Sequence, residues 1–414
     1  ITKEKDEGRK AEGRVVEILE RANTGFVGTY QKNKGFGFVI ADDKSIDDVY
    51  IDKKFSMGAK NKDKVVVEII SYPKKGSPEG RIAEILGSIN DKNIDIISSI
   101  RSHGIPSEFS KKTKKELLYI KDDVSTKEKE GRLDLRDLFT VTMDGRDSKD
   151  FDDAISIEKN GPNFDLYVHI ADVAHYVKKH TAIDDDAFAR GNSTYLYNIV
   201  VPMLPKELSN GICSLNPNEE RLSITAKMTI DKNGKVIDNS FSESLIISDY
   251  RLVYDDVNSY IDDGEEDVYD DPVLKEKLRD FETLYKILNK KRRQRGSIDF
   301  DFTESQIDVT DDGEVLNIST FERGSGNRMI EEFMLVANET VASLFAFMDF
   351  PFIYRIHEEP KKEKVESFKK ILNSLGYNIR GNELHPKDFQ RILKDVKGKD
   401  EESLVNMLML RTMQ

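Results

Sequence analysis

Five aspartates lie within ten consecutive residues and could bind a metal ion together. They are Asp144, Asp147, Asp150, Asp152 and Asp153, and only Arg146 and Lys149 oppose their charge within the segment. Crowded carboxylates resist ionisation unless a cation compensates them, and a set of oxygen ligands favours Mg²⁺, Mn²⁺ or Ca²⁺ over zinc. The cluster therefore predicts a site for a divalent cation.

Two other structures would also account for this acidic segment. An acidic surface loop needs no ligand, but the apolar stretches VTM (141–143) and AISI (154–157) predict flanking strands that would hold the carboxylates on rigid elements. A calcium loop of the EF-hand type, counted from Asp144, would place Lys149 where glycine is required and Ile155 where the closing glutamate belongs. The flanking strands and these two mismatches favour the metal site.

The elements expected around the cluster are first strands and then helices. Residues 131–250 are rich in β-pattern, and NGPN (160–163) predicts a turn between two strands. Asp271 and Pro272 suit the N-cap and first position of a helix that Gly296 ends, and a second helix is expected from about Arg328. This pattern predicts a mixed α+β domain over residues 131–414.

A small β-barrel is expected ahead of this domain. Short alternating stretches, KGFGFVI (34–40) and DVYIDKK (48–54), predict antiparallel strands. EGRVVEIL (12–19) recurs as EGRIAEIL (79–86), with six identities in eight positions and a spacing of 67 residues. This repeat suggests tandem barrels. We expect residues 1–21 to end a first barrel, 22–90 to form a second, and 91–130 to be a linker.

Composition and charge limit the class of protein. The net charge is −13, but residues 22–90 hold 11 Lys and Arg against 9 Asp and Glu, or +2, which leaves −15 elsewhere. Cys213 is the single cysteine and has no disulfide partner within the chain, and no apolar run is long enough for a membrane span. We expect a water-soluble, cytoplasmic, multidomain protein without a membrane partner.

Because it runs from Ile1 to Gln414 with neither a starting Met nor a helix-ending signal, we expect a piece truncated at both ends.

Four motifs in order carry a resemblance to a known family. RLDLRDLFTVTMDGRDSKDFDDAISI (132–157) resembles the catalytic signature of the ribonuclease II family. Three further motifs follow in the family's order: HIADVAHYV (169–177), GNSTYLYNIVVPMLPKELSNGICSLNP (191–217) and RMIEEFMLVAN (328–338). The sequences HIADVAHYV and GNSTYL are closer to the ribonuclease R branch of the family than to its ribonuclease II branch. The resemblance implies a magnesium-dependent, processive 3′ to 5′ exoribonuclease that releases nucleoside 5′-monophosphates, with Mn²⁺ as the alternative ion.

The resemblance also assigns roles to individual residues. Asp144, Asp150, Asp152 and Asp153 match the aspartates that hold the catalytic metal, with Asp152 nearest the attacking water, and Asp147 falls outside the set. The expected partner is the 3′ end of single-stranded RNA; ribosomes and RNA-decay factors are further candidates. The family's catalytic arginine belongs to a segment resembling TSPIRRY, which these 414 residues do not contain.

Aromatic and basic residues are the candidates for contact with RNA. Tyr195 and Phe300 match the two rings that, by resemblance, clamp the last nucleotides in the family. The stretches KGFGFV and DVYID resemble the aromatic motifs of cold-shock domains, whose OB-type barrel stacks single-stranded bases on exposed rings. The barrel candidates are Phe36, Phe38 and Tyr50 for stacking, and Lys32, Lys34 and Lys53 for phosphate.

Other reactive side chains are assigned structural roles. His169, Asp172 and His175 alternate along an expected strand, which favours hydrogen bonding over metal binding. Of Glu331 and Glu332, at most one faces an active site, because neighbouring helical residues point in different directions. Cys213 is expected to be a small buried residue. An RNA chaperone would explain the barrel without the aspartates, and a calcium-stabilised protein would explain the aspartates without KGFGFV.

Overall fold

The computed structural model describes residues 12–17, 19, 24–73, 75–196, 199–298, 304–310, 315–321, 323–377 and 384–413. The chain divides into two compact units. One comprises Ile1–Ser110, Asp186–Met203 and Asp308–Asn317, and the other Lys111–Asp185, Leu204–Ile307 and Ile318–Gln414.

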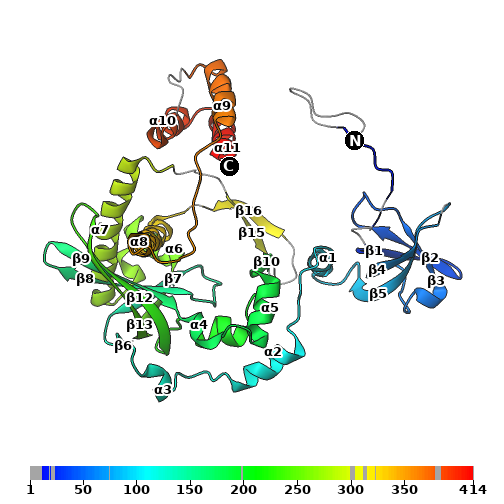
Figure 1. Ribbon diagram of the computed structural model, residues 1–414, viewed down its shortest axis with the longest axis horizontal. Helices are drawn as coiled ribbons and strands as arrows, with labels where there is room; N and C mark the ends of the chain where they lie inside the picture. The colour runs from blue at the N-terminus through cyan, green and yellow to red at the C-terminus, as the bar shows by residue number, and fades with distance from the viewer. Residues whose placement is uncertain are drawn as a thin grey trace. The chain divides into compact units, whose positions relative to one another are not determined.

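The first unit contains a closed five-stranded barrel, drawn in blue in Figure 1. Its strands are β1 (Gly25–Lys32), β2 (Phe36–Ala41), β3 (Val49–Asp52), β4 (Asp63–Ser71) and β5 (Glu79–Ser88), in the order β1-β2-β3-β5-β4. The pairs are antiparallel except β3 with β5. Alternate residues point inward, as the period of a strand requires, and form a core of Phe26, Tyr30, Val39, Val49, Ile51, Ala59, Val65, Val67 and Ile82. This confirms the predicted OB-type barrel.

Two glycines allow the barrel to close tightly. A Cβ on Gly37 of β2 would lie 2.3 Å from the Tyr30 ring, and one on Gly80 of β5 would lie 2.7 Å from a Val49 methyl. Real side chains never approach so closely, so both positions require glycine. The 3₁₀ turn η1 (Lys53–Phe55) follows β3, and helix α1 (Ile94–Ser102) packs against β5, β1 and β4.

The first copy of the sequence repeat does not form the expected strand. Gly13–Glu17 has no strand assignment, and Val15 and Val16 are 79% and 94% exposed, whereas Ile82, which corresponds to Val15 in the second copy, is 5% exposed within β5. A β-strand is stable only when its backbone is paired and one face is buried. No strand among the described residues pairs with this segment, so the segment does not form a strand despite its β-pattern.

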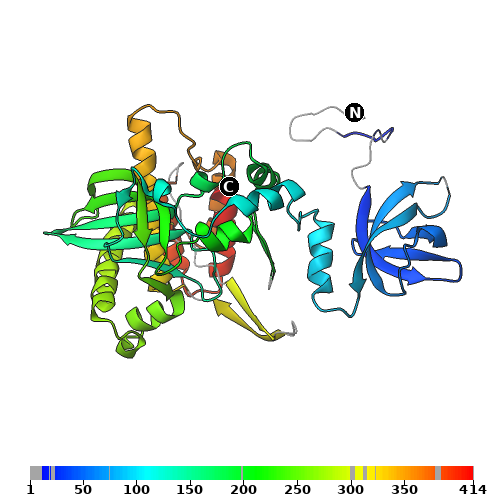
Figure 2. The same cartoon turned by 90° about the horizontal axis from the view of Figure 1, so that it is seen from below.

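The second unit is built on a seven-stranded sheet with the order β14-β7-β8-β9-β12-β13-β6 (Figures 1 and 2). The strands are β6 (Leu133–Asp134), β7 (Thr140–Asp144), β8 (Asp153–Asn160), β9 (Asn163–Ala171), β12 (Glu220–Ile230), β13 (Val236–Ile247) and β14 (Tyr250–Val253). Strands β8 and β9 are joined at Asn160–Asn163, where the sequence predicts a turn. The pairs β6–β13 and β7–β14 are parallel, and the others are antiparallel.

Three helices cover one face of this sheet: α6 (Tyr254–Ile261), α7 (Pro272–Arg295) and α8 (Ser325–Phe347). As predicted, α7 has Asp271 as its N-cap, with the carboxylate accepting from the Val273 amide at 2.8 Å, and ends at Gly296 with φ +99°. Its apolar face is buried in the sheet core, which includes Leu274, Leu278, Phe281, Leu284 and Leu288. The 3₁₀ turn η4 (Glu266–Val268) precedes α7.

Short helices and turns contribute to separate clusters around the sheet. The elements α2 (Lys111–Glu116), η2 (Leu117–Tyr119) and α3 (Thr126–Lys129) lie in the predicted linker, and α4 (Val173–Tyr176), α5 (Ala182–Arg190) and the π-helix η3 (Glu207–Ile212) follow. A buried cluster joins Val124, Ile183, Leu208, Cys213 and Leu245, which brings the linker, α5, η3 and the sheet together.

The remaining elements are two short hairpins and a helical group. The hairpins are β10 (Thr194–Leu196) with β11 (Ile199–Val201), and β15 (Glu304–Val309) with β16 (Val315–Phe321). Helices α9 (Lys362–Ser374), α10 (Pro386–Val396) and α11 (Glu402–Met413) share their own core around Phe368, Leu372, Phe389 and Met409. None of the helices in the described residues has the length and apolar character needed to cross a membrane. The second unit is therefore α+β, as predicted.

Candidate functional site

The predicted carboxylate cluster lies at the ends of two neighbouring strands of the large sheet. Asp144 is the last residue of β7 and Asp153 the first of β8, so the loop between them carries Asp150 and Asp152. Asp144 is aligned with Val253 of β14, and Asp153 with Ile170 of β9. Both strands continue directly into the buried core, and this fixes the backbone of the two terminal aspartates.

The four aspartates influence one another electrostatically. Burial, followed by the charges of Asp153, Asp150 and Asp152, raises the pKa of Asp144 to about 7. Burial and the charge of Asp152 raise the pKa of Asp153 to about 6. Desolvation and the charge of Asp150 raise the pKa of Asp152, although this side chain keeps access to solvent. The structure thus brings the four predicted residues into one field of negative charge that a cation would relieve.

The chemistry of these side chains fits a hard divalent cation. They offer oxygen ligands only, and their mutual repulsion in a partly buried position is the condition that such an ion compensates. Among the residues with described positions, no three His, Cys, Asp or Glu side chains are arranged as a ready-made metal-binding group. Mg²⁺ often uses one or two protein carboxylates and completes its shell with water and substrate phosphate. The four aspartates are therefore the residues that would hold such a cation.

Arg251 of β14 organises the loop that carries the aspartates. Its guanidinium donates to the carbonyl oxygens of Gly145 (3.2 Å), Arg146 and Ser148 (3.4 Å), and lies 5.3 Å from the centre of the Phe151 ring. One side chain thus connects both halves of the loop. Its positive charge also opposes the rise in the pKa of Asp144.

Ser214 holds the same loop from the other side. Its hydroxyl accepts from the Phe151 amide at 3.0 Å and donates to the Lys149 carbonyl at 3.1 Å, and the Leu215 amide donates to the Phe151 carbonyl at 2.9 Å. Phe151 is itself buried with Leu215 and Ile246. Backbone and ring contacts therefore fix Asp150 and Asp152, the two neighbours of Phe151 in the sequence.

Sequence reasoning missed three residues of this site: Arg251, Ser214 and Tyr254. Burial and the charges of Asp144 and Asp153 raise the pKa of Tyr254, so these two carboxylates influence its hydroxyl electrostatically. Tyr254 and Arg251 lie about a hundred residues from the cluster in the chain, in a stretch with no chemical signature. Ser214 lies inside the quoted GICSLNP motif, which was the one available signal.

The residues assigned structural roles have separate partners. His169 is fully buried between the hydroxyls of Ser156 (3.0 Å) and Thr225 (2.7 Å), and burial lowers its pKa to about 3, so it is neutral. Asp172 accepts from Arg132 at 2.6 Å, with both side chains buried, and caps the turn that contains His175. The His175 ring lies 3.1 Å from Glu128. These hydrogen bonds and ion pairs link β8, β9 and β12 to one another, and α4 to the linker.

The two glutamates of α8 face different partners. Glu332 is 3% exposed and accepts from Arg292 at 2.6 Å and from Asn289 at 2.8 Å, both on α7. Glu331 lies 3.6 Å from Arg292 and 3.8 Å from Arg323. Cys213 is buried, as predicted, and burial raises its pKa to about 12, so it is no nucleophile near neutral pH.

The barrel candidates for RNA contact form one aromatic group. The ring centres of Phe36 and Tyr50 are 5.6 Å apart, and that of Phe38 lies 5.9 Å from Phe36 and 5.8 Å from Tyr50. All three rings are half-buried on β2 and β3, and the exposed lysines are Lys32, Lys34 and Lys53. Partly exposed rings beside cations are suited to stacking bases while binding phosphate.

Of the two predicted clamp residues, the structure describes the position of Tyr195 alone. Tyr195 lies in β10, paired with Val200, and is 66% exposed. A ring so accessible is available to a ligand. Phe300 lies outside the described residues, so its assignment stays a prediction.

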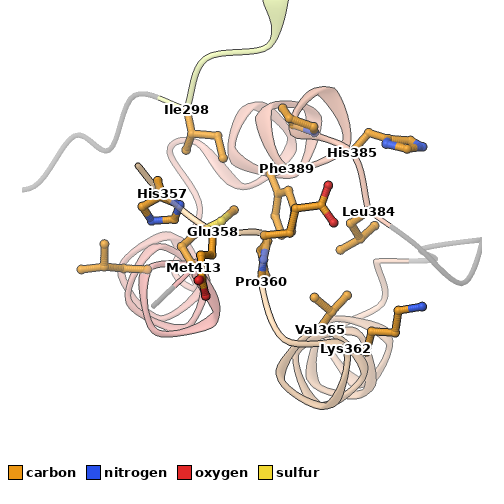
Figure 3. Close-up of a pocket in the computed structure, with 13 residues that line it drawn as sticks. Ile298, His357, Glu358, Pro360, Lys362, Val365, Leu384, His385, Phe389 and Met413 are labelled. Atoms are coloured by element: carbon orange, nitrogen blue, oxygen red, sulfur yellow. The ribbon is translucent and has the colours of Figure 1, made fainter. Parts of the chain in front are cut away.

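A cavity of about 500 Å³ lies in the C-terminal helical group (Figure 3), and none of the predicted site residues with described positions lines it. Its lining includes His357, Glu358, His385, Phe389 and Met413, from α10, α11 and the segment before α9. No member of the carboxylate cluster belongs to it. The candidate chemistry therefore sits at strand ends and not in this cavity.

Two family models match this chain, one for each of its two domains. The RNB domain family matches residues 132–414, and the cold shock domain family matches residues 38–110. Ribonuclease R of Thermotoga maritima is 41% identical over 410 residues, which cover 97% of this chain and 58% of that protein. Ribonuclease R 1 of Lactococcus lactis is 39% identical over 423 residues, which cover 98% of this chain and 52% of that protein.

A solved structure shares the fold over almost the whole chain. Mycoplasma genitalium RNase R, in complex with ribose-methylated single-stranded RNA, superposes with a TM-score of 0.91 at 28% identity. The match covers 98% of this chain and 65% of that one. The chain thus spans little more than half the length of the two curated relatives. Since the RNB match extends over more than half of its residues, the chain belongs to the RNB domain family and carries a cold shock domain before its RNB domain.

Proposed function

We propose that the protein containing this chain is a magnesium-dependent exoribonuclease that degrades single-stranded RNA processively from its 3′ end. The expected products are nucleoside 5′-monophosphates, Mn²⁺ is the expected substitute ion, and RNA degradation and quality control are the expected setting. The observation that carries the proposal is the group of four aspartates on β7, β8 and their loop, with the pKa of Asp144 raised to about 7 and that of Asp153 to about 6. A further support is that M. genitalium RNase R has been solved with single-stranded and with double-stranded RNA.

We assign different roles in catalysis to the individual residues of the site. Asp144, Asp150 and Asp153 would hold the ion, because Asp144 and Asp153 are fixed at strand ends and Arg251 and Ser214 fix the loop. Bound Mg²⁺ would neutralise charge on the scissile phosphate and make a bound water more acidic. Asp152 keeps access to solvent and would orient the attacking water. Tyr254 would contact the same carboxylates or the phosphate through its hydroxyl.

Base stacking would hold the RNA without regard to its sequence. Tyr195 offers an exposed aromatic face and the barrel rings offer partly exposed ones, and stacking contributes roughly 1 to 3 kcal/mol per base. A substrate held in this way can move through the site one nucleotide at a time. This supports cleavage that does not depend on the RNA sequence.

The test is digestion of 5′-labelled linear RNA and of circular RNA of the same sequence by the full-length parent protein. We expect the linear RNA to shorten from its 3′ end with release of nucleoside 5′-monophosphates, and the circular RNA to persist. A chelator should stop the reaction and added Mg²⁺ should restore it. Cleavage of the circle at the rate of the linear RNA would exclude an exonuclease, and turnover that survives chelation would exclude the metal site.

A further inference from the structure

The short helix α2 carries an unusual concentration of positive charge. Its sequence is KKTKKE, so four of its six residues are lysines, in a chain whose net charge is −13. The four lysines, Lys111, Lys112, Lys114 and Lys115, are all exposed. Positive charge gathered on one element of an acidic protein marks a surface for a polyanion.

The structure shows why these lysines face solvent. Thr113 is fully buried, and its hydroxyl donates to the Ala182 carbonyl at 2.9 Å. The Ile183 amide donates to the carboxylate of Glu116 at 3.2 Å. Residues three apart share a helix face, so Thr113 and Glu116 attach α2 to the start of α5, and the lysines at the other positions stay exposed.

This arrangement has an electrostatic cost within the helix. Lys111 and Lys115 are four residues apart, and like charges at that spacing repel each other. The single acidic residue of α2, Glu116, is turned toward α5. In the part of the chain with described positions, Lys111, Lys112 and Lys115 take part in no ion pair. A bound polyanion would supply the missing negative charge.

An exposed aromatic ring follows the lysines directly. In the turn η2, Leu117 packs against a buried cluster, whereas Leu118 and Tyr119 are 81% and 86% exposed. Packing does not account for a tyrosine ring this accessible. Beside four cations it provides a face on which a base can stack.

We propose that α2 and Tyr119 form a docking surface for single-stranded RNA outside the carboxylate site. The lysines bind backbone phosphates, and the Tyr119 ring stacks on a base. The inference rests on the proposed function in one respect, since it takes RNA as the substrate. It adds a second contact region, which only RNA long enough to extend beyond the catalytic residues can reach.

The experiment measures RNA affinity and turnover separately in the full-length parent protein. The variant is Lys111→Gln with Lys112→Gln and Lys115→Gln, which keeps good helix formers and leaves Thr113, Lys114 and Glu116 in place. Binding of long single-stranded RNA is measured in chelator, where no degradation occurs. We expect affinity to fall roughly tenfold at moderate salt, and the slope of log affinity against log salt to decrease by about 2, because three phosphate contacts are lost.

Two further variants make the result specific. Lys232→Gln with Lys235→Gln and Lys370→Gln removes the same charge from exposed lysines elsewhere, and should behave like the wild type. Tyr119→Ala should weaken binding of long RNA without changing the salt slope, because stacking is uncharged. Turnover of an RNA only a few nucleotides long, with Mg²⁺, should be unchanged in all three variants.

Each other outcome has a definite meaning. If the α2 variant matches the control variant in affinity and slope, the docking surface is refuted. If turnover of the short RNA falls as well, α2 supports the catalytic unit and is not a separate contact. Lysine-dependent binding to phosphatidylserine vesicles with unchanged RNA affinity would assign α2 to a lipid surface instead. If the wild type binds long RNA through α2 but degrades nothing, the proposed function fails while the docking surface stands.

Discussion

At the scale of single residues, the site depends on how four similar carboxylates are made different. Asp144 and Asp153 are held at strand ends, and their pKa values are raised to about 7 and about 6. Asp152 lies beside the buried Phe151 yet keeps access to solvent. The same residue type can therefore bind an ion at one position and orient a water molecule at another, because burial and neighbouring charge set the pKa of each carboxylate.

Asp152→Asn should reduce turnover far more than RNA binding. The substitution keeps the shape of the side chain and removes one negative charge, so water orientation suffers while stacking and phosphate contacts remain. In the full-length parent we expect at least about a hundredfold loss of turnover, equivalent to about 2.7 kcal/mol of transition-state stabilisation. The control is Asp147→Asn, an exposed carboxylate outside the set, which should retain activity. Normal turnover with weakened RNA binding in Asp152→Asn would require the metal site to be redrawn.

Mg²⁺ should stabilise the chain more at about pH 8 than at about pH 5. A folded-state pKa raised above the ordinary value of an aspartate means that the folded protein holds protons that the unfolded chain has lost, so stability falls as pH rises from about 4 to about 7. Mg²⁺ binds the deprotonated carboxylates and should offset this loss. The measurement is the difference in melting temperature with Mg²⁺ and with chelator at each pH. The double substitution Asp144→Asn with Asp153→Asn should abolish that difference; its persistence would locate Mg²⁺ elsewhere.

At the scale of elements, a side chain on strand β14 holds the loop that follows the neighbouring strand β7. Arg251 on β14 reaches three carbonyl oxygens of the loop after β7, and the parallel pairing of β14 with β7 places it there. In the barrel, too, strand pairing brings side chains together: the adjacent strands β2 and β3 place Phe36, Phe38 and Tyr50 side by side. In both places strand pairing sets the relative positions of residues that are distant in sequence.

Arg251→Lys should raise the Mg²⁺ concentration needed for activity and lower turnover. Lysine keeps the positive charge but cannot span three carbonyl oxygens or stack on Phe151. We expect a loss of roughly tenfold or more in turnover, as when one positioning contact is removed from an active site. Arg146→Lys is the matched control, because Arg146 belongs to the same loop but pairs at the surface with Asp256. An unchanged Mg²⁺ dependence in Arg251→Lys would show that the loop is held by Ser214 and Phe151 alone.

Replacing Phe36 and Phe38 together by Ala should weaken binding of single-stranded RNA to the isolated barrel, residues 24–110. Both rings are half-buried on the surface, and the core lies on the opposite side of the strands, so the fold should survive. Binding is measured by fluorescence anisotropy, and the fold by circular dichroism. Tyr72→Ala, at a ring that is 42% exposed outside the aromatic group, is the control. Equal affinity in the double variant and the wild type would remove the stacking assignment.

At the scale of the whole molecule, the chain contains separate hydrophobic cores. The barrel core and the sheet core share no residue, and the chain divides into two compact units. Units with independent cores can unfold independently. The RNA recognition proposed for the barrel and the hydrolysis proposed for the sheet unit therefore need not depend on the same stability.

Calorimetric unfolding of the chain should show two transitions, of which Mg²⁺ shifts only one. The four aspartates belong to the sheet unit, so a bound ion stabilises that unit and leaves the barrel unaffected. The isolated barrel provides the reference for assigning the transitions. A single cooperative transition that Mg²⁺ shifts as a whole would mean that the two units are energetically one.

The sequence by itself determined the fold class, the candidate metal ligands and the limits of several elements. Alternating apolar residues identified the barrel strands, and Asp271, Pro272 and Gly296 marked both ends of α7. These features depend on residues close in the chain, where spacing and cap chemistry suffice. The segment Gly13–Glu17 shows the limit of such reasoning, because a β-pattern forms a strand only if another strand pairs with it.

The tertiary structure alone decided which distant residues complete the carboxylate site. Arg251, Ser214 and Tyr254 reach the loop or its aspartates only after β14, the segment after η3 and the start of α6 are assembled around the sheet. It also decided that the lysines of α2 face outward, since Thr113 and Glu116 find their partners on α5. Hydrogen bonds, burial and pKa shifts depend on distances through space, which the order of residues along a chain does not contain.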